Sequence, residues 1–170
     1  RVTTADFFGL FDVPFLYGGP WDPRADDDHA SIAVIGRELN DKLFGGENSV
    51  GRRIRLDDGY FDIVGVIDDW QPTPRFYHVD AGGSFADTEQ VFIPLLRAVD
   101  VPMGPRGNTN CWAPLDESLP TLQAFLQSEC VWTQFWVELE SPAQASAYRD
   151  YLDNYAREQQ AAGRFPRPLN

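Results

Sequence analysis

The sequence has few of the residue types that build metal or redox centres. Its 170 residues include two histidines, His29 and His78, and two cysteines, Cys111 and Cys130. A zinc site of two histidines and two cysteines would use all four, and neither histidine stands in an H-x-x-x-H or H-x-E context. No G-x-S-x-G sequence is present, and neither cysteine has a neighbouring base. The sequence therefore predicts no catalytic residue, no cofactor and no metal ion.

Basic residues are also scarce. Fourteen Lys and Arg stand against 26 Asp and Glu, which gives a net charge of −12. Nucleic-acid binding needs a basic stripe, and an anionic lipid surface attracts clustered Lys and Arg. Neither pattern is present, so we expect no nucleic-acid partner. No apolar run reaches the roughly 18 residues that would indicate a membrane-spanning helix.

The sequence does contain clear strand signals. Two strand-like runs, 53–56 and 60–67, flank an Asp-Gly turn, which is typical of a β-hairpin. The second run is apolar on both faces, so we expect it to be a central buried strand. Apolar residues alternate over 131–140, which indicates a strand with one buried face. Further strands are expected at 13–17, 31–35 and 91–95.

Apolar spacing and end signals also indicate helices. Helices are expected over 1–12, 37–44, 120–128 and 141–162. Gly45 supplies the left-handed residue that ends the second of these. Ser141 and Gln144 form a capping box at the start of the fourth, which is long enough to cover a sheet.

These elements predict an α+β fold, with helices packed on a mainly antiparallel sheet. Two long segments rich in proline and glycine, 69–90 and 97–118, interrupt the order of strands. Connections of this length usually pack as a lobe or serve a function. We therefore expect a single domain over 1–170, with an inserted irregular lobe over about 69–130.

Three polar motifs fit a structural role better than a chemical one. Gly46 to Arg52 has the spacing of a phosphate-binding loop, but a helix precedes it and a strand follows, which is the reverse of the required order. The run from Asp26 to His29 lacks the ligand register of a calcium loop and is interpreted as a solvated acidic loop. Asp68 and Asp69 are adjacent on a strand end, so they point to opposite faces and do not form a catalytic pair.

Aromatic residues make up 14% of the chain and provide a candidate partner surface. We expect it to comprise Trp70, Phe76, Tyr77, Trp132 and Trp136. The last two alternate on one strand face, which is either covered by a lobe or exposed as an interface. The same aromatic residues could instead stack on sugars.

Cys111 and Cys130 form a candidate structural disulfide. The loop between them has about 20 residues, and closing it would contribute about 3 kcal/mol to stability. A bridge would pin an irregular segment to the framework and would require an oxidising compartment. The alternative is two unpaired buried thiols.

An ordered set of short stretches resembles the extracytoplasmic domain of MacB/FtsX-like ABC transporter permeases. In chain order they are Val2-Thr3, Asp6 to Phe8, Val13 to Leu16, Gly18, Ile32 to Ile35, Leu43 to Gly45, Val50 to Ile54, Phe61 to Ile67 and Val91 to Leu95. Their order and spacing match over residues 2–95. The sequence departs from the family at Gly19, where an Arg is usual, and segment 97–130 has no counterpart that we can place.

The resemblance implies a non-catalytic domain on the periplasmic face of a bacterial cytoplasmic membrane. A separate or fused cytoplasmic ATPase would do the chemistry, and membrane helices would transmit its motion to this domain, which expels or relays substrate. The implied partners are the protein's own transmembrane helices, a second permease copy and a periplasmic adaptor. The chain would then be a fragment cut between two membrane helices. The alternatives are a carbohydrate-binding module or glycosidase fragment, and an extracellular interaction domain unrelated to transport.

Overall fold

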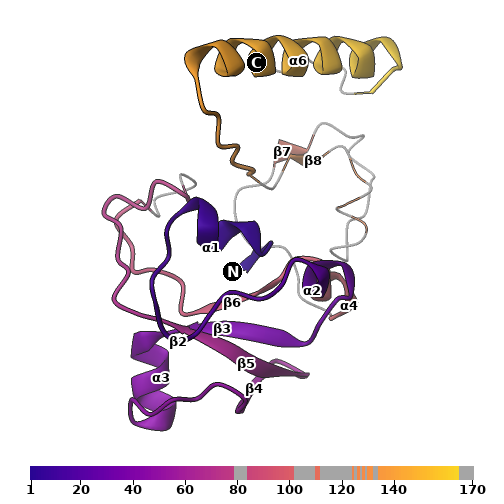
Figure 1. Cartoon of the computed structure of the whole chain (residues 1–170). Coiled ribbons are helices and arrows are strands. Elements are labelled where there is room, and N and C mark those ends of the chain that lie inside the picture. The colour runs from indigo at the N-terminus through magenta and orange to yellow at the C-terminus, as the bar shows by residue number, and fades with distance from the viewer. Residues whose placement is uncertain are drawn as a thin grey trace. The chain divides into compact units, whose positions relative to one another are not determined.

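The chain divides into two compact units, Arg1–Gly104 and Pro105–Asn170. A computed structural model describes residues 1–78, 84–101, 110–111, 124, 126, 128, 130–131 and 134–164. Figure 1 shows the elements of both units.

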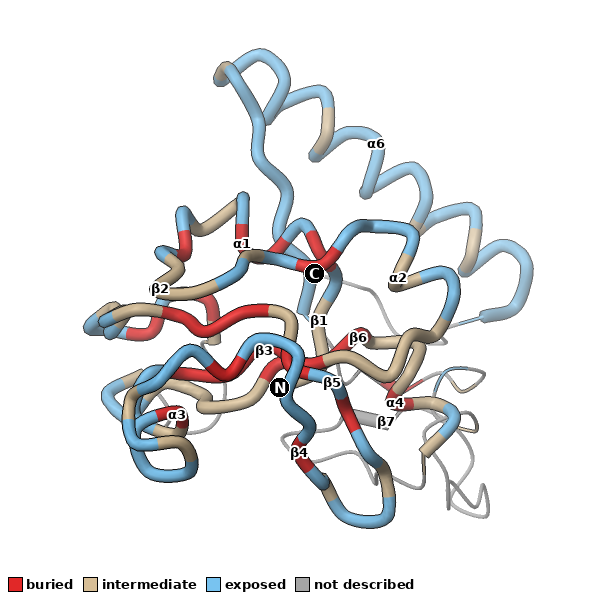
Figure 2. Tube along the Cα trace, turned by 60° about the horizontal axis from the view of Figure 1, so that its bottom comes forward, coloured by how far each residue is buried: buried red, intermediate tan, exposed pale blue. Residues whose placement is uncertain are grey.

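The first unit contains a six-stranded sheet with the strand order β1-β6-β3-β5-β2, in which β4 also pairs with β5. Its elements are β1 (Val2–Thr3), α1 (Asp6–Leu10), β2 (Phe15–Gly18), α2 (Arg24–Asp27), β3 (Ile32–Gly36), α3 (Arg37–Phe44), β4 (Arg53–Leu56), β5 (Gly59–Ile67), β6 (Val91–Pro94) and α4 (Arg97–Asp100). Helices α1 and α3 lie on opposite sides of this sheet (Figures 1 and 2).

The sheet is mixed. Three pairings are antiparallel (β2–β5, β4–β5 and β3–β6), and two are parallel (β1–β6 and β3–β5). The α+β prediction is confirmed, and long connections account for the parallel pairs because such pairs cannot be joined by a tight turn. Strand β5 has β3 along one edge and both β4 and β2 along the other. It is the central strand that the apolar run predicts.

Local signals explain the α3-to-β5 segment. Helix α3 ends at Gly45, whose φ of 66° is the left-handed conformation that glycine adopts without cost. The predicted hairpin forms with Leu56 opposite Gly59, so its two-residue turn is Asp57-Asp58. A side chain at Gly65 would overlap the carbonyl oxygen of Gly19, so glycine is required there for β2 to pack beside β5.

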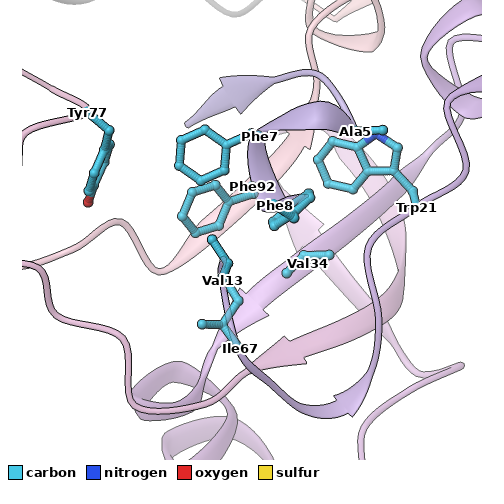
Figure 3. Packing of buried hydrophobic residues seen from close by; sticks show 9 residues of the cluster. All are labelled: Ala5, Phe7, Phe8, Val13, Trp21, Val34, Ile67, Tyr77 and Phe92. Carbon is cyan, nitrogen blue, oxygen red and sulfur yellow. The ribbon is translucent and has the colours of Figure 1, made fainter. Parts of the chain in front are cut away.

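An aromatic core fills the space between α1 and the sheet. Its buried members are Ala5, Phe7, Phe8, Val13, Trp21, Val34, Ile67, Tyr77 and Phe92 (Figure 3). The rings of Phe8 and Trp21 meet edge to face at 4.8 Å, a favoured arrangement of aromatic pairs. Each such residue contributes about 1.5–3 kcal/mol through burial.

The interpretation of the acidic run as a solvated loop is wrong for Asp26. Its carboxylate accepts a hydrogen bond from the backbone N–H of Ala5 at 2.8 Å and from the Trp21 indole at 3.0 Å. Asp26 therefore holds the start of α1 against a core tryptophan. The sequence pattern missed this role because both partners lie outside the run.

The second unit contains β7 (Asn110–Cys111), β8 (Cys130–Val131) and α6 (Pro142–Ala161). The capping box is confirmed, because the Ser141 hydroxyl accepts a hydrogen bond from the Gln144 N–H at 3.2 Å. The Gln144 side chain in turn accepts from the N–H of Glu140 at 2.6 Å. Helix α6 has no buried residue, and it is mostly coloured as exposed in Figure 2.

The predicted strand over 131–140 is wrong. Strand β8 ends at Val131, and residues 134–139 form no regular structure and are exposed. Alternating polarity does not make a strand without a neighbouring strand to supply hydrogen bonds. The predicted helix over 120–128 lies mostly outside the described residues.

Candidate functional site

Four side chains converge on the carboxylate of Glu89, just before β6. The Tyr77 hydroxyl donates a hydrogen bond to Oε2 at 2.9 Å, and His78 Nδ1 lies 3.0 Å from Oε1. The guanidinium groups of Arg1 and Arg75 lie 3.4 and 3.5 Å from Oε1. We call these five residues the Glu89 cluster. It joins the start of the chain and the long segment before β6 to the sheet.

The Glu89 cluster is largely shielded from water. The side chain of Arg75 is 8% exposed, and that of Glu89 is 18% exposed. Burial raises the pKa of the Glu89 carboxyl, but hydrogen bonds from its own backbone and from Tyr77, together with the two guanidinium charges, outweigh burial and hold that pKa below its ordinary value. Glu89 is therefore anionic at neutral pH.

Tyr77 is the aromatic member of the cluster. Burial first, and then the charge of Glu89, raise the pKa of its hydroxyl, so Tyr77 is neutral and can donate a hydrogen bond. Its ring stacks on Trp70 at 5.0 Å and meets Phe7 edge to face at 5.6 Å. The Arg1 guanidinium lies 5.2 Å from the ring centre, which adds a cation–π interaction.

The burial of Tyr77 corrects the predicted partner surface. Tyr77 is fully buried, because its ring fills the core and its hydroxyl reaches Glu89. Trp70 is half-buried, and Phe76 is 46% exposed. In the second unit Trp136 is exposed, whereas Trp132 lies outside the described residues. A partner surface on the first unit therefore cannot include Tyr77.

A hollow of about 190 Å³ opens beside the first turn of α3. The Arg37 guanidinium and Asp68 form an ion pair of 2.7 Å on its wall, so Asp68 is engaged without Asp69. Gln90 Oε1 accepts a hydrogen bond from the N–H of Leu39 at 3.2 Å and so caps α3, whose N-cap residue is a glycine, Gly36. The hollow is smaller than the usual pocket for a small-molecule ligand.

The two histidines contact two different carboxylates. His29 Nδ1 is 2.7 Å from Asp100 Oδ2, and His78 contacts Glu89. Within the described residues, no group of three or more His, Cys, Asp or Glu side chains is arranged to hold a metal ion.

The cysteines lie opposite each other in the β7–β8 ladder, where Cys111 pairs with Cys130. Directly opposed residues of antiparallel strands have Cα atoms about 4.5–5.5 Å apart, within the range that a disulfide spans. The bridge stays a prediction, and this register supports it.

Sequence patterns missed the Glu89 cluster. Arg1 and Arg75 lie 88 and 14 residues from Glu89, so no local motif links them. The only sequence signal is an acidic residue two positions before a buried strand.

No helix among the described residues is both long and apolar enough to cross a bilayer. A sequence model of the MacB-like periplasmic core domain matches residues 1–155. The chain is 34% identical over 62 residues to the pyoverdine export ATP-binding/permease protein PvdT of Pseudomonas aeruginosa. It is 31% identical over 65 residues to the macrolide export ATP-binding/permease protein MacB of Syntrophobacter fumaroxidans. These matches cover 36% and 38% of this chain and 9% of each curated relative.

Two solved structures are similar to part of the chain. One is the periplasmic region of MacB from Actinobacillus actinomycetemcomitans, with 14% identity and a TM-score of 0.43 over 57% of this chain and 37% of that one. The other is the extracellular domain of the ABC-type transporter YknZ from Gram-positive bacteria. Its identity is 13% and its TM-score 0.40, over 55% of this chain and 41% of that one.

Proposed function

Because this chain belongs to the MacB-like periplasmic core domain family, we propose that it is the external, non-catalytic part of an ABC-type export permease. It lies on the periplasmic face of the membrane and passes on the movement of membrane helices to a substrate or partner. The observation that carries this proposal is the family match over residues 1–155. In this proposal residues 1–170 form one extracytoplasmic portion.

Energy in this proposal comes from a cytoplasmic ATPase, either separate or fused to the permease. Two relatives carry both functions in their names, as ATP-binding/permease proteins, which supports a fused ATPase. The remaining partners are the protein's own transmembrane helices, a second permease copy and a periplasmic adaptor.

The first unit is suited to moving as one body. Its six strands belong to one sheet, and the aromatic core joins α1 to that sheet. The Glu89 cluster adds a second connection, from Arg1 and Arg75 to the start of β6. Packed cores transmit displacement because they deform little. The polar side chains that the sequence offered as candidates for chemistry are also engaged in structural contacts, because Asp68 forms an ion pair with Arg37 and each histidine contacts a carboxylate.

The parent gene provides the first test. It should encode apolar segments of about 20 residues on both sides of this region. A phosphate-binding G-x-x-x-x-G-K-[ST] motif should occur in the same or an adjacent reading frame. A parent protein with neither feature would overturn the proposal.

A deletion then tests the role of the domain itself. Removing residues 1–155 from the parent protein should abolish export and leave ATP binding by the ATPase intact. Normal export by the deleted protein would contradict the relay role. The carbohydrate-binding alternative is less favoured, because Tyr77 is buried and Trp70 half-buried.

A further inference from the structure

Two phenylalanines project from the long segment that precedes β6. Phe85 is 82% exposed and Phe76 is 46% exposed. The N–H of Arg75 donates a hydrogen bond to the carbonyl oxygen of Ser84 at 2.7 Å. Each phenylalanine directly follows one of these bonded residues, so the two lie on neighbouring backbone segments, which we treat as one patch. The patch comprises residues 75–76 and 84–85.

The Phe76 side of the patch is held in place by buried contacts. The side chain of Arg75 is 8% exposed, and its guanidinium donates a hydrogen bond to the carbonyl oxygen of Asp87 at 2.8 Å. The same guanidinium contacts Glu89, and the next residue, Tyr77, lies in the core. The Phe76 ring meets Phe11 edge to face at 5.5 Å. An aromatic group fixed before binding loses little conformational entropy when it docks.

Along the segment that carries the patch, the exposed charged side chains have one sign. Over the described residues 69–78 and 84–90, the exposed charged side chains are Asp69 and Asp87. Arg75 is buried, and Glu89 is paired with it. The whole chain carries a net charge of −12. A second copy and an anionic lipid surface are therefore disfavoured by repulsion, and a basic surface is favoured.

We propose that Phe76 and Phe85 dock into an apolar pocket with a Lys- and Arg-rich rim on a separate protein. Exposed aromatic residues contribute strongly to protein interfaces when a pocket excludes water from them. The acidic surroundings provide attraction to the rim and select against like-charged proteins. The inference rests on the proposed function in one respect, namely that a relay domain needs a partner to receive its movement.

Photocrosslinking in the full-length parent protein tests this surface in cells. Benzoylphenylalanine is placed at position 85 or 76, and at position 60 as the matched control. Tyr60 is also aromatic and is 58% exposed, but it belongs to the β4–β5 hairpin. Positions 85 and 76 should yield an adduct with a different polypeptide, through a peptide that contains Lys or Arg, and position 60 should not.

Binding of the identified protein to the full-length parent protein then gives a quantitative test. Phe85→Ser should raise the Kd about tenfold or more, equivalent to about 1.4 kcal/mol. Tyr60→Ser should leave the Kd unchanged, and the Kd should rise with salt concentration. Phe85→Ser removes an exposed ring, so it tests binding without opening the core. Circular dichroism spectra that match the parent protein check this.

Several results would overturn the proposal that Phe76 and Phe85 form a docking surface. In the crosslinking experiment, these are an adduct only with a second copy, an adduct only with lipid, or a yield no higher than that of the control at position 60. In the binding experiment, they are a Kd that Phe85→Ser does not change or a Kd that does not change with salt concentration. The proposed function fails on different observations, since it depends on the flanking apolar segments and the ATPase motif.

Discussion

The two units of the chain use similar apolar patterns with opposite results. In the first unit Phe7, Phe8 and Phe92 form part of a closed aromatic core. In the second, α6 carries Tyr151, Leu152 and Tyr155 at helical spacing, and all three are exposed. All buried hydrophobic side chains of the described residues belong to the first unit, apart from Cys130. Helical periodicity thus identifies a helix and its apolar face, whereas burial depends on what packs against that face.

The largest expected effect comes from opening the aromatic core. Phe92→Ala should lower the free energy of unfolding by about 3–5 kcal/mol, because it leaves a cavity among fully buried rings. Tyr151→Ala on α6 should change it by less than about 0.5 kcal/mol. Urea denaturation of both variants measures the difference. An equal loss of unfolding free energy in the two variants would show that apolar side chains contribute equally to stability in both units.

The predicted disulfide between Cys111 and Cys130 provides a second test, because it should stabilise only the second unit. Thiol titration of the unfolded, unreduced chain should find no free thiol, because Cys111 and Cys130 are expected to be joined. Reduction should then destabilise the second unit by about 3 kcal/mol and leave the first unit unchanged. Two reactive thiols before reduction would contradict the bridge.

A substitution in the Glu89 cluster tests whether its buried ion pairs stabilise the first unit. Glu89→Gln leaves the buried Arg75 guanidinium without its counter-charge and should cost about 2 kcal/mol. Asp58→Asn, at a side chain that is 89% exposed, provides the control and should have no measurable effect on chemical denaturation. A neutral Glu89→Gln result would show that the aromatic core alone holds this region.

The same substitution should alter acid sensitivity. The pKa of Glu89 is lower in the folded protein than its ordinary value of 4.5, so its stabilising effect is present above that value. The effect is lost as the pH falls through the folded pKa. Denaturation midpoints measured between neutral pH and pH 3 should converge for Glu89→Gln and the unaltered protein. A constant difference over this range would contradict the assigned pKa direction.

The smallest expected effect concerns the start of α6. Ser141→Ala removes the hydroxyl that accepts from the Gln144 N–H and should cost about 1 kcal/mol of helix stability. Ser146→Ala, at an exposed position within the same helix, should be neutral or slightly stabilising. Far-ultraviolet circular dichroism during heating compares them. Equal melting curves would mean that the cap does not stabilise α6.

Local signals made much of the framework predictable from sequence. Gly45 ends α3, the Asp-rich turn closes the β4–β5 hairpin, and Ser141 caps α6. In each case the residues that carry the signal act within a few positions along the chain. The family resemblance over residues 2–95 was also readable, and the match over 1–155 confirms it.

Contacts between distant segments could not be read in this way. Asp26 is a carboxylate within an acidic run, and only the fold brings it to Ala5 and Trp21. Tyr77 was expected on a partner surface, and only the fold brings its ring into the core. The alternation over 131–140 had the pattern of a strand, but polarity alone does not supply a hydrogen-bonded neighbour.

The pairing of β1 with β6 sets the order in which the sheet can be completed during synthesis. Val2 pairs with Ile93, so β1 leaves the ribosome about 90 residues before its partner. At translation rates of about 5–20 residues per second, this delay lasts roughly 5–20 seconds. The hairpin of β4 and β5 needs no such wait, because its strands are separated by two residues. The sheet can therefore begin at β5, and β1 is among the last of its six strands to be incorporated.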